Sequence, residues 1–416
     1  MPSALESLAA LIQNPALDAQ AASRIERLRL HIADTIGMML RGSTLPEGKA
    51  AMMVGSPVVG SCACARLTEA DDIHLTSCTT PGSVVVPTAL RLASIGAFKT
   101  FGDFVTAVLA GYETLIRVGY AIDGPQILAQ KVWPTLFAAG IGAAAVASSA
   151  WKLNASQTAG ALATALAAST GIAPPAMISN SSRCISLGLA AEHGLLAAEA
   201  ARQGAAGDAQ LLERHAGRIA GIRLSPRRLL QKAERFFFFD EIGLKPYPIA
   251  RQALAAVEAC RQLIGGKTRG ISAITVRVPS AQSRIIDQAA WPSNRMQSIA
   301  GAQYQIALAL LFPERLMEFD RTPPFETKEL KSLAAKIRVR SEKRLDVHYP
   351  EMWPAQVIVE QSGKRKSTLL SAPIGDSRNP MGWEHVLLKS SPYHSLLTAI
   401  RTANPQEPIP HCVLEW

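Results

Sequence analysis

The chain contains 416 residues, with 43 Lys and Arg against 33 Asp and Glu, so its formal net charge at pH 7 is +10. Hydrophobic residues make up 48% and charged residues 18%, which excludes a disordered chain and provides apolar side chains for two or three domains. The basic excess is spread out, and its short run Lys364-Arg365-Lys366 is too small to follow a phosphate backbone. We therefore expect no nucleic-acid partner, with anionic-polymer binding as a weaker alternative. The charge indicates either small anionic substrates or a merely basic surface.

The first 240 residues follow a helical period. Residues 25–39 place apolar side chains at three- and four-residue spacing behind Ser23-Arg-Ile-Glu26, a capping-box pattern, and 101–117 repeats the period. Asn154-Ala-Ser-Gln157 predicts another helix start, and small residues pattern a helix over 188–203. This half is expected to be all helical.

Two uncharged stretches, Val132 to Ala150 and Thr158 to Ile178, raise the question of a membrane. Both are rich in Ala, Gly and Ser and are interrupted by prolines, which favours buried helices in a tightly packed soluble core over membrane spans. The first thirteen residues contain Glu6 and no Lys or Arg, unlike a secretory signal. The six cysteines show no spacing typical of metal or redox sites. We therefore expect a cytoplasmic protein with free thiols and no membrane association.

After Lys245 the period changes to two. Alternation around 274–278 and 337–339 predicts strands, and residues 357–370 read as a hairpin turning at Ser362-Gly363. Residues 298–311 and 384–401 are again helical, and 373–380 form a loop. The expected fold is mainly α with an α+β second domain. Residues 1–243, completed by a C-terminal helical region at 384–416, would form a large all-α domain, and 244–383 an inserted α+β domain.

The densest polar cluster, Glu69-Ala-Asp71-Asp72-Ile-His74, is the first candidate for chemistry. Neighbouring carboxylates raise one another's pKa, and a histidine titrates near neutrality, so the segment could supply a general acid or base. A capped turn or solvated helix end explains the pattern equally well. Two adjacent aspartates and one histidine are an incomplete ligand set, so no metal is predicted.

Two further segments carry candidate cations. In Lys245-Pro246-Tyr247-Pro248 the prolines stiffen the chain and could aim Lys245 and Tyr247 into a cleft, although an interdomain hinge is the alternative. Arg183 lies near a predicted helix start, which suits an anion site, or else it is a surface residue. Dinucleotide, P-loop and hydrolase motifs are absent from the sequence, so nucleotide cofactors and hydrolase triads are not predicted.

Taken in order, these segments resemble the MmgE/PrpD family, whose members include 2-methylcitrate dehydratase, cis-aconitate decarboxylase and iminodisuccinate epimerase. The resemblance spans most of the chain and rests on an ordered set of motifs: Ile32-Ala-Asp-Thr-Ile-Gly37, Glu69 to Asp72, Pro81-Gly-Ser, Val85-Val-Pro87, Gly111-Tyr-Glu113, Trp133-Pro134, Gly188 to Gly194 and Lys245-Pro-Tyr-Pro248. It implies a helical domain built from both chain ends, an inserted α+β lid, an active site between them, a homodimer, small polycarboxylate substrates and no cofactor.

The resemblance also implies roles for single residues. Glu69 stands where the family has a catalytic-site Asp, Asp71 and Asp72 match its acidic pair, and Lys245 matches its motif lysine. Arg183 stands where many members have Lys. The chain departs from the pattern at three histidine positions and at a tyrosine position. These departures are Thr80, Trp133 and Ser186 in place of His, and Leu308 in place of Tyr, with Tyr304 one helical turn earlier.

The expected protein is therefore a cofactor-independent lyase or isomerase that moves a proton alpha to a carboxylate or carbonyl of a small organic acid. The predicted catalytic residues are Glu69, Asp71, Asp72, His74, Lys245 and Tyr247. The predicted substrate-binding residues are Thr80, Trp133, Arg183, Ser186 and Tyr304. The alternatives are an epimerase or isomerase with a non-citrate substrate, and a non-catalytic homologue that binds a metabolite.

Overall fold

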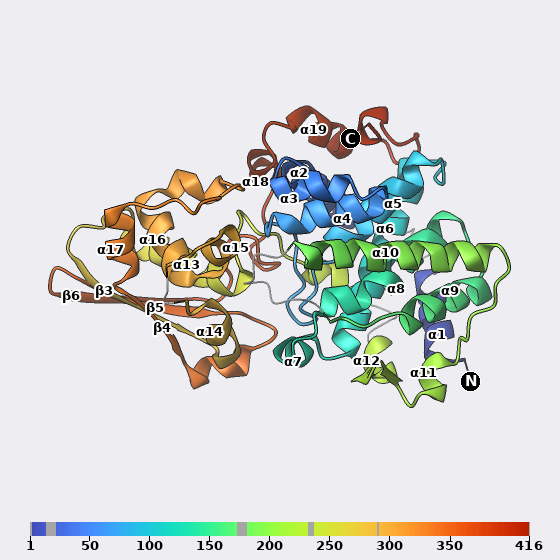
Figure 1. The fold of residues 1–416 in the computed structure, drawn as a ribbon, viewed down its shortest axis with the longest axis horizontal. Coiled ribbons are helices and arrows are strands. Elements are labelled where there is room, and N and C mark those ends of the chain that lie inside the picture. The colour runs from blue at the N-terminus through green and yellow to red at the C-terminus, as the bar shows by residue number, and fades with distance from the viewer. Residues whose placement is uncertain (1, 14–21, 173–180, 232–236, 289–290, 416) are drawn as a thin grey trace. The chain divides into compact units, whose positions relative to one another are not determined.

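The computed structural model describes residues 2–13, 22–172, 181–231, 237–288 and 291–415 (Figure 1). They are mainly helical, with two small sheets, and fall into two compact units. The first unit takes the described residues up to 172, those from 181 to 242 and those from 382 onward. The second takes the described residues from 243 to 381.

The first unit consists of helices and one short hairpin. In chain order its elements are α1 (Ala4–Ile12), α2 (Ala22–Ser43), α3 (Pro46–Met52), α4 (Pro57–Leu67), α5 (Gly82–Ser94), α6 (Phe101–Ala121), α7 (Gly124–Ala129), α8 (Pro134–Ala150), α9 (Ala155–Ala167), α10 (Ser182–Arg202), α11 (Leu211–Arg214), β1 (Arg218–Ile219), β2 (Ile222–Arg223), α12 (Pro226–Leu229), the 3-10 turn η2 (Phe238–Glu241), α18 (Trp383–Lys389), α19 (His394–Thr402) and the 3-10 turn η5 (His411–Val413).

Local sequence explains several of the helix boundaries. Asn154 caps α9 and forms the predicted capping box with Gln157. The capping box predicted at Ser23 is wrong, because α2 already begins at Ala22 and Ser23 lies inside it. The helical stretch predicted over 384–401 is two helices, α18 and α19, separated at residues 390–393 by a turn that contains Pro392.

The uncharged stretch at 132–150 forms α8, which is buried along almost its whole length and packs against α6 and α10 (Figure 1). Small residues allow this close approach, since a Cβ on Gly194 of α10 would overlap the carbonyl oxygen of Gly140 on α8. The second uncharged stretch begins within α9. The part of this stretch from residue 173 onward lies outside the described residues. Among the helices of the described residues, none is long and apolar enough to cross a membrane.

The second unit is an α+β layer. Its elements are α13 (Arg251–Ile264), β3 (Ile271–Val278), α14 (Ser280–Ile286), α15 (Arg295–Ala300), α16 (Ala302–Leu311), the 3-10 turn η3 (Pro313–Met317), α17 (Lys328–Ala334), β4 (Ile337–Ser341), the 3-10 turn η4 (Lys343–His348), β5 (Ala355–Gln361) and β6 (Lys364–Leu370). The helix predicted over 298–311 is broken at Gly301, which ends α15 and precedes α16.

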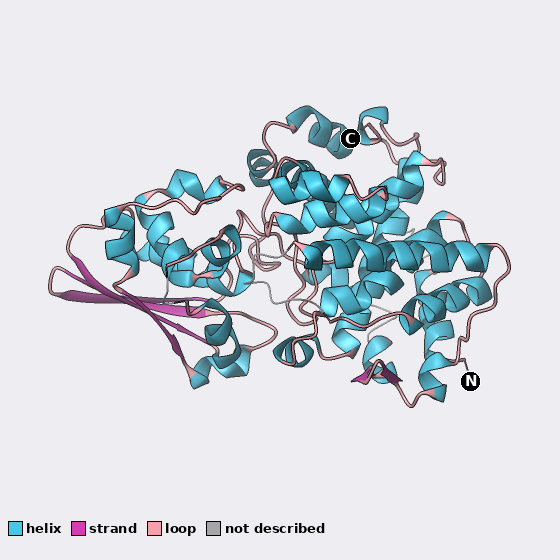
Figure 2. Ribbon diagram, in the orientation of Figure 1, coloured by secondary structure: helices cyan, strands magenta, loops and turns pink. Residues whose placement is uncertain are grey.

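The four strands form one sheet in the order β4-β3-β5-β6, shown in magenta in Figure 2. β3 pairs with β4 in parallel and with β5 antiparallel. The predicted hairpin is confirmed as β5 and β6, whose connecting residues Ser362 and Gly363 both have positive φ, as a tight hairpin turn requires. The alternating apolar residues of β3 are buried in a core shared with α13 and α16.

We predict that Gly194→Ala destabilises the first unit. Helix propensity alone favours Ala over Gly by about 1 kcal/mol. The overlap with Gly140 should reverse that sign and lower the free energy of unfolding by about 2 kcal/mol. Denaturant unfolding measures the change. Gly382→Ala is the control for an added methyl group, because a Cβ there meets no atom within 4 Å; Gly382 is the N-cap of α18, so any loss in this variant reflects capping and not overlap. A Gly194→Ala protein at least as stable as wild type would contradict the packing.

Candidate functional site

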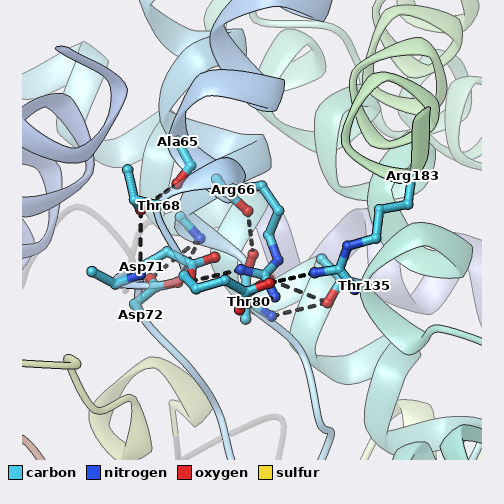
Figure 3. Close-up of polar contacts among 12 residues, drawn as sticks. Ala65, Arg66, Thr68, Asp71, Asp72, Thr80, Thr135 and Arg183 are labelled. Carbon is cyan, nitrogen blue, oxygen red and sulfur yellow. Dashed lines mark hydrogen bonds and ion pairs between the residues drawn. The ribbon is translucent and has the colours of Figure 1, made fainter. Parts of the chain in front are cut away.

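The acidic segment forms a tight turn directly after α4. The Thr68 hydroxyl donates to the carbonyl oxygen of Ala65 at 2.8 Å and accepts from the Ala70 backbone N–H at 3.3 Å (Figure 3). Glu69 takes a left-handed backbone conformation with φ of 53°, which is uncommon for a residue with a side chain. Such a conformation persists only where surrounding contacts hold it. The turn folds the Glu69 and Asp71 side chains back onto the last turn of α4.

Two arginines meet the carboxylates of this turn. Arg66 donates to Asp71 Oδ1 at 3.1 Å and to Glu69 Oε2 at 2.7 Å. Arg183, the second residue of α10, donates to the other Glu69 oxygen at 2.5 Å. We call these four residues, Arg66, Glu69, Asp71 and Arg183, the arginine–carboxylate cluster. The side chains of all four are less than 10% exposed.

The cluster keeps the Arg66 guanidinium charged. Burial acts to lower the pKa of Arg66, but Asp71 and Glu69 outweigh it and hold that pKa above its usual value. Arg66 Nε is buried and has no hydrogen-bond partner among the described residues. The two guanidinium charges of the cluster are balanced by its two carboxylates, so a ligand carboxylate fits here by taking the place of one of them, with Arg66 Nε as an additional donor.

Trp133 covers both arginines. Its ring centroid lies 5.0 Å from Arg183 Cζ and 5.6 Å from Arg66 Cζ, within the range of cation–π contacts. It precedes α8, and its backbone N–H donates to the Gly171 carbonyl oxygen at 2.9 Å. Thr80 contacts the first turn of the same helix, where its N–H donates to Thr135 Oγ1 at 3.1 Å.

Asp72 points into the interior. Its carboxylate accepts from the Gly82 N–H, the first residue of α5, at 3.0 and 3.2 Å, and from the Tyr112 hydroxyl at 2.8 Å. Burial and the nearby Asp72 raise the pKa of Tyr112 well above its usual value, so the phenol remains a donor. His31 Nδ1 lies 3.8 Å from the same carboxylate. These contacts fix the end of the acidic turn to α5 and α6.

His74 is fully buried and held by its own neighbours. Its Nδ1 lies 2.8 Å from Ser77 Oγ and accepts from the Ser77 N–H at 3.3 Å, so the proton sits on Nε2, which is 3.3 Å from Glu241 Oε2. Burial lowers the His74 pKa despite Glu241, so the imidazole is neutral at pH 7. This geometry suits a residue that ties the loop to η2.

A buried lysine supports the turn from behind. Lys389, at the end of α18, pairs with Asp34 of α2 at 2.5 Å and donates to the Ala70 carbonyl oxygen, between Glu69 and Asp71, at 2.8 Å. Both Lys389 and Asp34 are completely buried. Burial raises the Asp34 pKa to about 6, although Lys389 opposes the shift. The C-terminal segment thus holds the backbone of the acidic turn.

A second buried carboxylate holds η2. Glu113 accepts from the Phe239 N–H at 2.8 Å and from Arg117 Nε at 3.2 Å. Burial raises the Glu113 pKa to about 7, against the effects of Arg117 and the Phe239 N–H. Because η2 carries Glu241, Glu113 indirectly positions the partner of His74.

Three predicted site residues belong to the second unit, and a fourth bonds within its own helix. Lys245 is 2% exposed. The Tyr247 hydroxyl donates to Glu258 at 2.7 Å, and the Tyr304 hydroxyl donates to the Phe325 carbonyl oxygen at 2.9 Å. In the first unit, Ser186 Oγ donates to the Ser182 carbonyl oxygen of α10. The hydroxyl groups of Tyr247, Tyr304 and Ser186 therefore each donate a hydrogen bond to another group of the protein.

Of the predicted residues, the structure brings together Glu69, Asp71, Arg183 and Trp133. Sequence reasoning missed Arg66 and the buried support from Asp34, Lys389, His31 and Tyr112. The only local signal for Arg66 was its spacing, three residues before Glu69. In the described part of the chain, no group of three or more His, Cys, Asp and Glu side chains is placed to hold a metal ion.

Comparison with known proteins gives two matches. Residues 59–226 match the MmgE/PrpD N-terminal domain, and residues 247–403 match the MmgE/PrpD C-terminal domain. No curated protein matches the chain significantly. The N-terminal match contains the whole arginine–carboxylate cluster, and the C-terminal match contains Tyr247 and Lys389.

We predict that Lys389→Met lowers the free energy of unfolding by about 3 kcal/mol, because it leaves Asp34 buried without its counter-charge. Denaturant unfolding at pH 7 measures the loss. The matched control is Lys152→Met, whose lysine is 68% exposed and pairs with Asp103 on the surface. Adding Asp34→Asn to Lys389→Met should recover part of the loss. Equal effects of Lys389→Met and Lys152→Met would refute the buried pair.

Glu113 predicts a pH dependence. Its folded pKa of about 7 exceeds the ordinary 4.5, so between these values the folded state holds a proton that the unfolded state releases. This group's contribution to stability is therefore present below pH 4.5 and falls as pH rises through 7, by about 3 kcal/mol in total. In Glu113→Gln that decline should vanish, so the stability of the variant relative to wild type should increase with pH. If the unfolding free energies of wild type and Glu113→Gln change in parallel between pH 4.5 and 7, the raised pKa of Glu113 is ruled out.

Proposed function

This chain belongs to the MmgE/PrpD family, and we propose that it is a lyase or isomerase that moves a proton alpha to a carboxylate or carbonyl of a small organic acid. Members of the family are generally lyases, dehydratases or isomerases. One observation carries the proposal, namely that two buried guanidinium groups, on Arg66 and Arg183, converge on the single carboxylate of Glu69.

We assign substrate binding to these arginines. A substrate carboxylate has the shape and charge of the Glu69 carboxylate and can take its place between them. Asp71 stays on Arg66, and the unused Arg66 Nε supplies a further donor. The Trp133 ring closes one side with an apolar surface.

We assign the role of base to Glu69. Once displaced from its arginines, a buried carboxylate is disfavoured in its charged form and gains by taking up a proton. The proton comes from the carbon alpha to the bound carboxylate, and its bonding electrons pass into that group as an enediolate. Arg66 and Arg183 then stabilise the growing negative charge. Expulsion of a β-substituent completes a lyase reaction, and reprotonation at the same carbon completes an isomerase or epimerase reaction.

The other predicted catalytic residues receive different roles. Asp72 and His74 are positioning residues in this proposal, because their contacts hold α5 and η2. Lys245 and Tyr247, which belong to the second unit, keep their predicted catalytic roles as hypotheses. The cofactor-independent mechanism, the homodimer and the cytoplasmic location also remain predictions.

A non-catalytic metabolite-binding homologue is the second candidate. It is favoured by Thr80, Trp133 and Ser186 at positions where the family resemblance implies histidines, and by the neutral, enclosed His74. Both candidates use the same two arginines for the ligand carboxylate. They differ in whether Glu69 transfers a proton.

Solvent deuterium exchange separates the candidates. The protein is incubated in D2O with malate, citrate, 2-methylcitrate or aspartate, and loss of the alpha-proton signal is followed by NMR. We predict enzyme-dependent exchange with at least one of them. Glu69→Gln should slow it by about 100-fold or more without weakening binding, because the variant removes the charged carboxylate that competes with the substrate for Arg66 and Arg183. Arg183→Gln should mainly weaken binding.

Arg202→Gln is the matched control, because Arg202 lies on the same helix but pairs with Glu199 at the surface. Lys245→Met and Tyr247→Phe in the same assay test the second unit's hypotheses. A ligand that binds through Arg183 without exchange would favour the binding-only homologue. Wild-type exchange in both Glu69→Gln and Arg183→Gln would exclude the cluster as the site.

A further inference from the structure

The first unit has a hollow away from the arginine–carboxylate cluster. Its volume is about 380 Å³, within the range of small-molecule sites. It lies between the corner from α6 to α7 and the hairpin of β1 and β2, and it shares no lining residue with the cluster. Its lining residues include Asp123, Gln126, Gln130, Arg218, Arg223 and Arg228.

The hairpin places two like charges face to face. In the antiparallel pair, Arg218 is directly opposite Arg223, and Ile219 is opposite Ile222. Both isoleucines are buried and both arginines are exposed, so the two guanidinium groups extend from the same face. Like charges directly opposite on neighbouring strands destabilise the pair. A two-residue strand has little ladder energy to set against this repulsion.

The rest of the hollow does not neutralise this charge. Arg228 contributes a third guanidinium, which pairs with Asp123 at 3.1 Å and lies over the Tyr120 ring at 4.4 Å. Among the described lining residues Asp123 is the one acidic residue, so within this part of the chain three positive charges face one negative charge. Arg218 makes one long bond, at 3.4 Å, to the Gly221 carbonyl oxygen within the same turn. The amides of Gln126 and Gln130 add neutral donors.

We infer that this hollow binds a small anion with phosphate or carboxylate groups, bridging Arg218 and Arg223. Guanidinium groups bind both kinds of oxyanion through paired N–H donors. The bound anion replaces the repulsion between the arginines with two charge-assisted contacts. It also links the hairpin to the α6–α7 corner, so binding stabilises the first unit. The inference does not depend on the proposed activity.

Calorimetry and thermal unfolding of the full chain test the site, with pyrophosphate and citrate as the two probes. We expect at least one probe to bind wild type and raise its Tm, with affinity falling as NaCl is added. The double variant Arg218→Gln/Arg223→Gln should bind that probe about tenfold more weakly or worse. Arg227→Gln is the matched control, because Arg227 is exposed on neighbouring α12 but does not line the hollow. The stronger probe identifies the phosphate or carboxylate class.

A second measurement needs no ligand. Because Arg223→Gln removes the charge opposite Arg218, the Tm of this variant at low salt should equal or exceed that of wild type.

Citrate could also bind the arginine–carboxylate cluster, so each titration is repeated in Arg183→Gln, which should leave binding at the hollow unchanged. The inference is overturned if neither probe binds wild type, if the double variant binds as wild type does, or if Arg183→Gln abolishes all binding. Each of these results leaves the proton-exchange test of function intact.

Discussion

The carboxylate of Glu69, held by Arg66 on one oxygen and Arg183 on the other, is the contact on which the rest of the first unit's chemistry depends. Buried charges are tolerated only when paired and hydrogen-bonded, so the cluster holds three stretches, one of them more than 100 residues away, in one geometry. These stretches are the end of α4, the turn after it and the start of α10. The left-handed backbone at Glu69 is the local cost of closing that turn.

Contacts from other elements hold the acidic turn at residues 68–72 in place. Lys389 holds its backbone at Ala70, and Asp72 ties its far end to α5. The helices behind it pack through small residues such as Gly194, which leaves little freedom to shift. In such a rigid surround, a ligand carboxylate can replace that of Glu69 while Arg66 and Arg183 stay in place. This is the arrangement expected of a preorganised site.

The sequence pattern predicted those features of the fold and the site that depend on neighbouring residues in the chain. It located the hairpin at Ser362 and Gly363, and it singled out Glu69, Asp71 and Arg183, three of the four cluster residues. It could not find Arg66, whose contact depends on the left-handed turn at Glu69, nor Lys389, which is 319 residues from its partner Ala70. It also could not separate a catalytic His74 from one held by Ser77, because spacing is the same in both cases. Such pairings follow from tertiary packing, which periodicity does not encode.

A crystal structure of the protein soaked with succinate is the most direct measurement of the central claim, that the cluster exchanges its internal carboxylate for that of a ligand. It should show a succinate carboxylate bonded to Arg183 and Arg66 beside the Trp133 ring, with Glu69 moved off both guanidinium groups. A structure in which succinate is bound elsewhere, and Glu69 still bridges the two arginines, would contradict the claim.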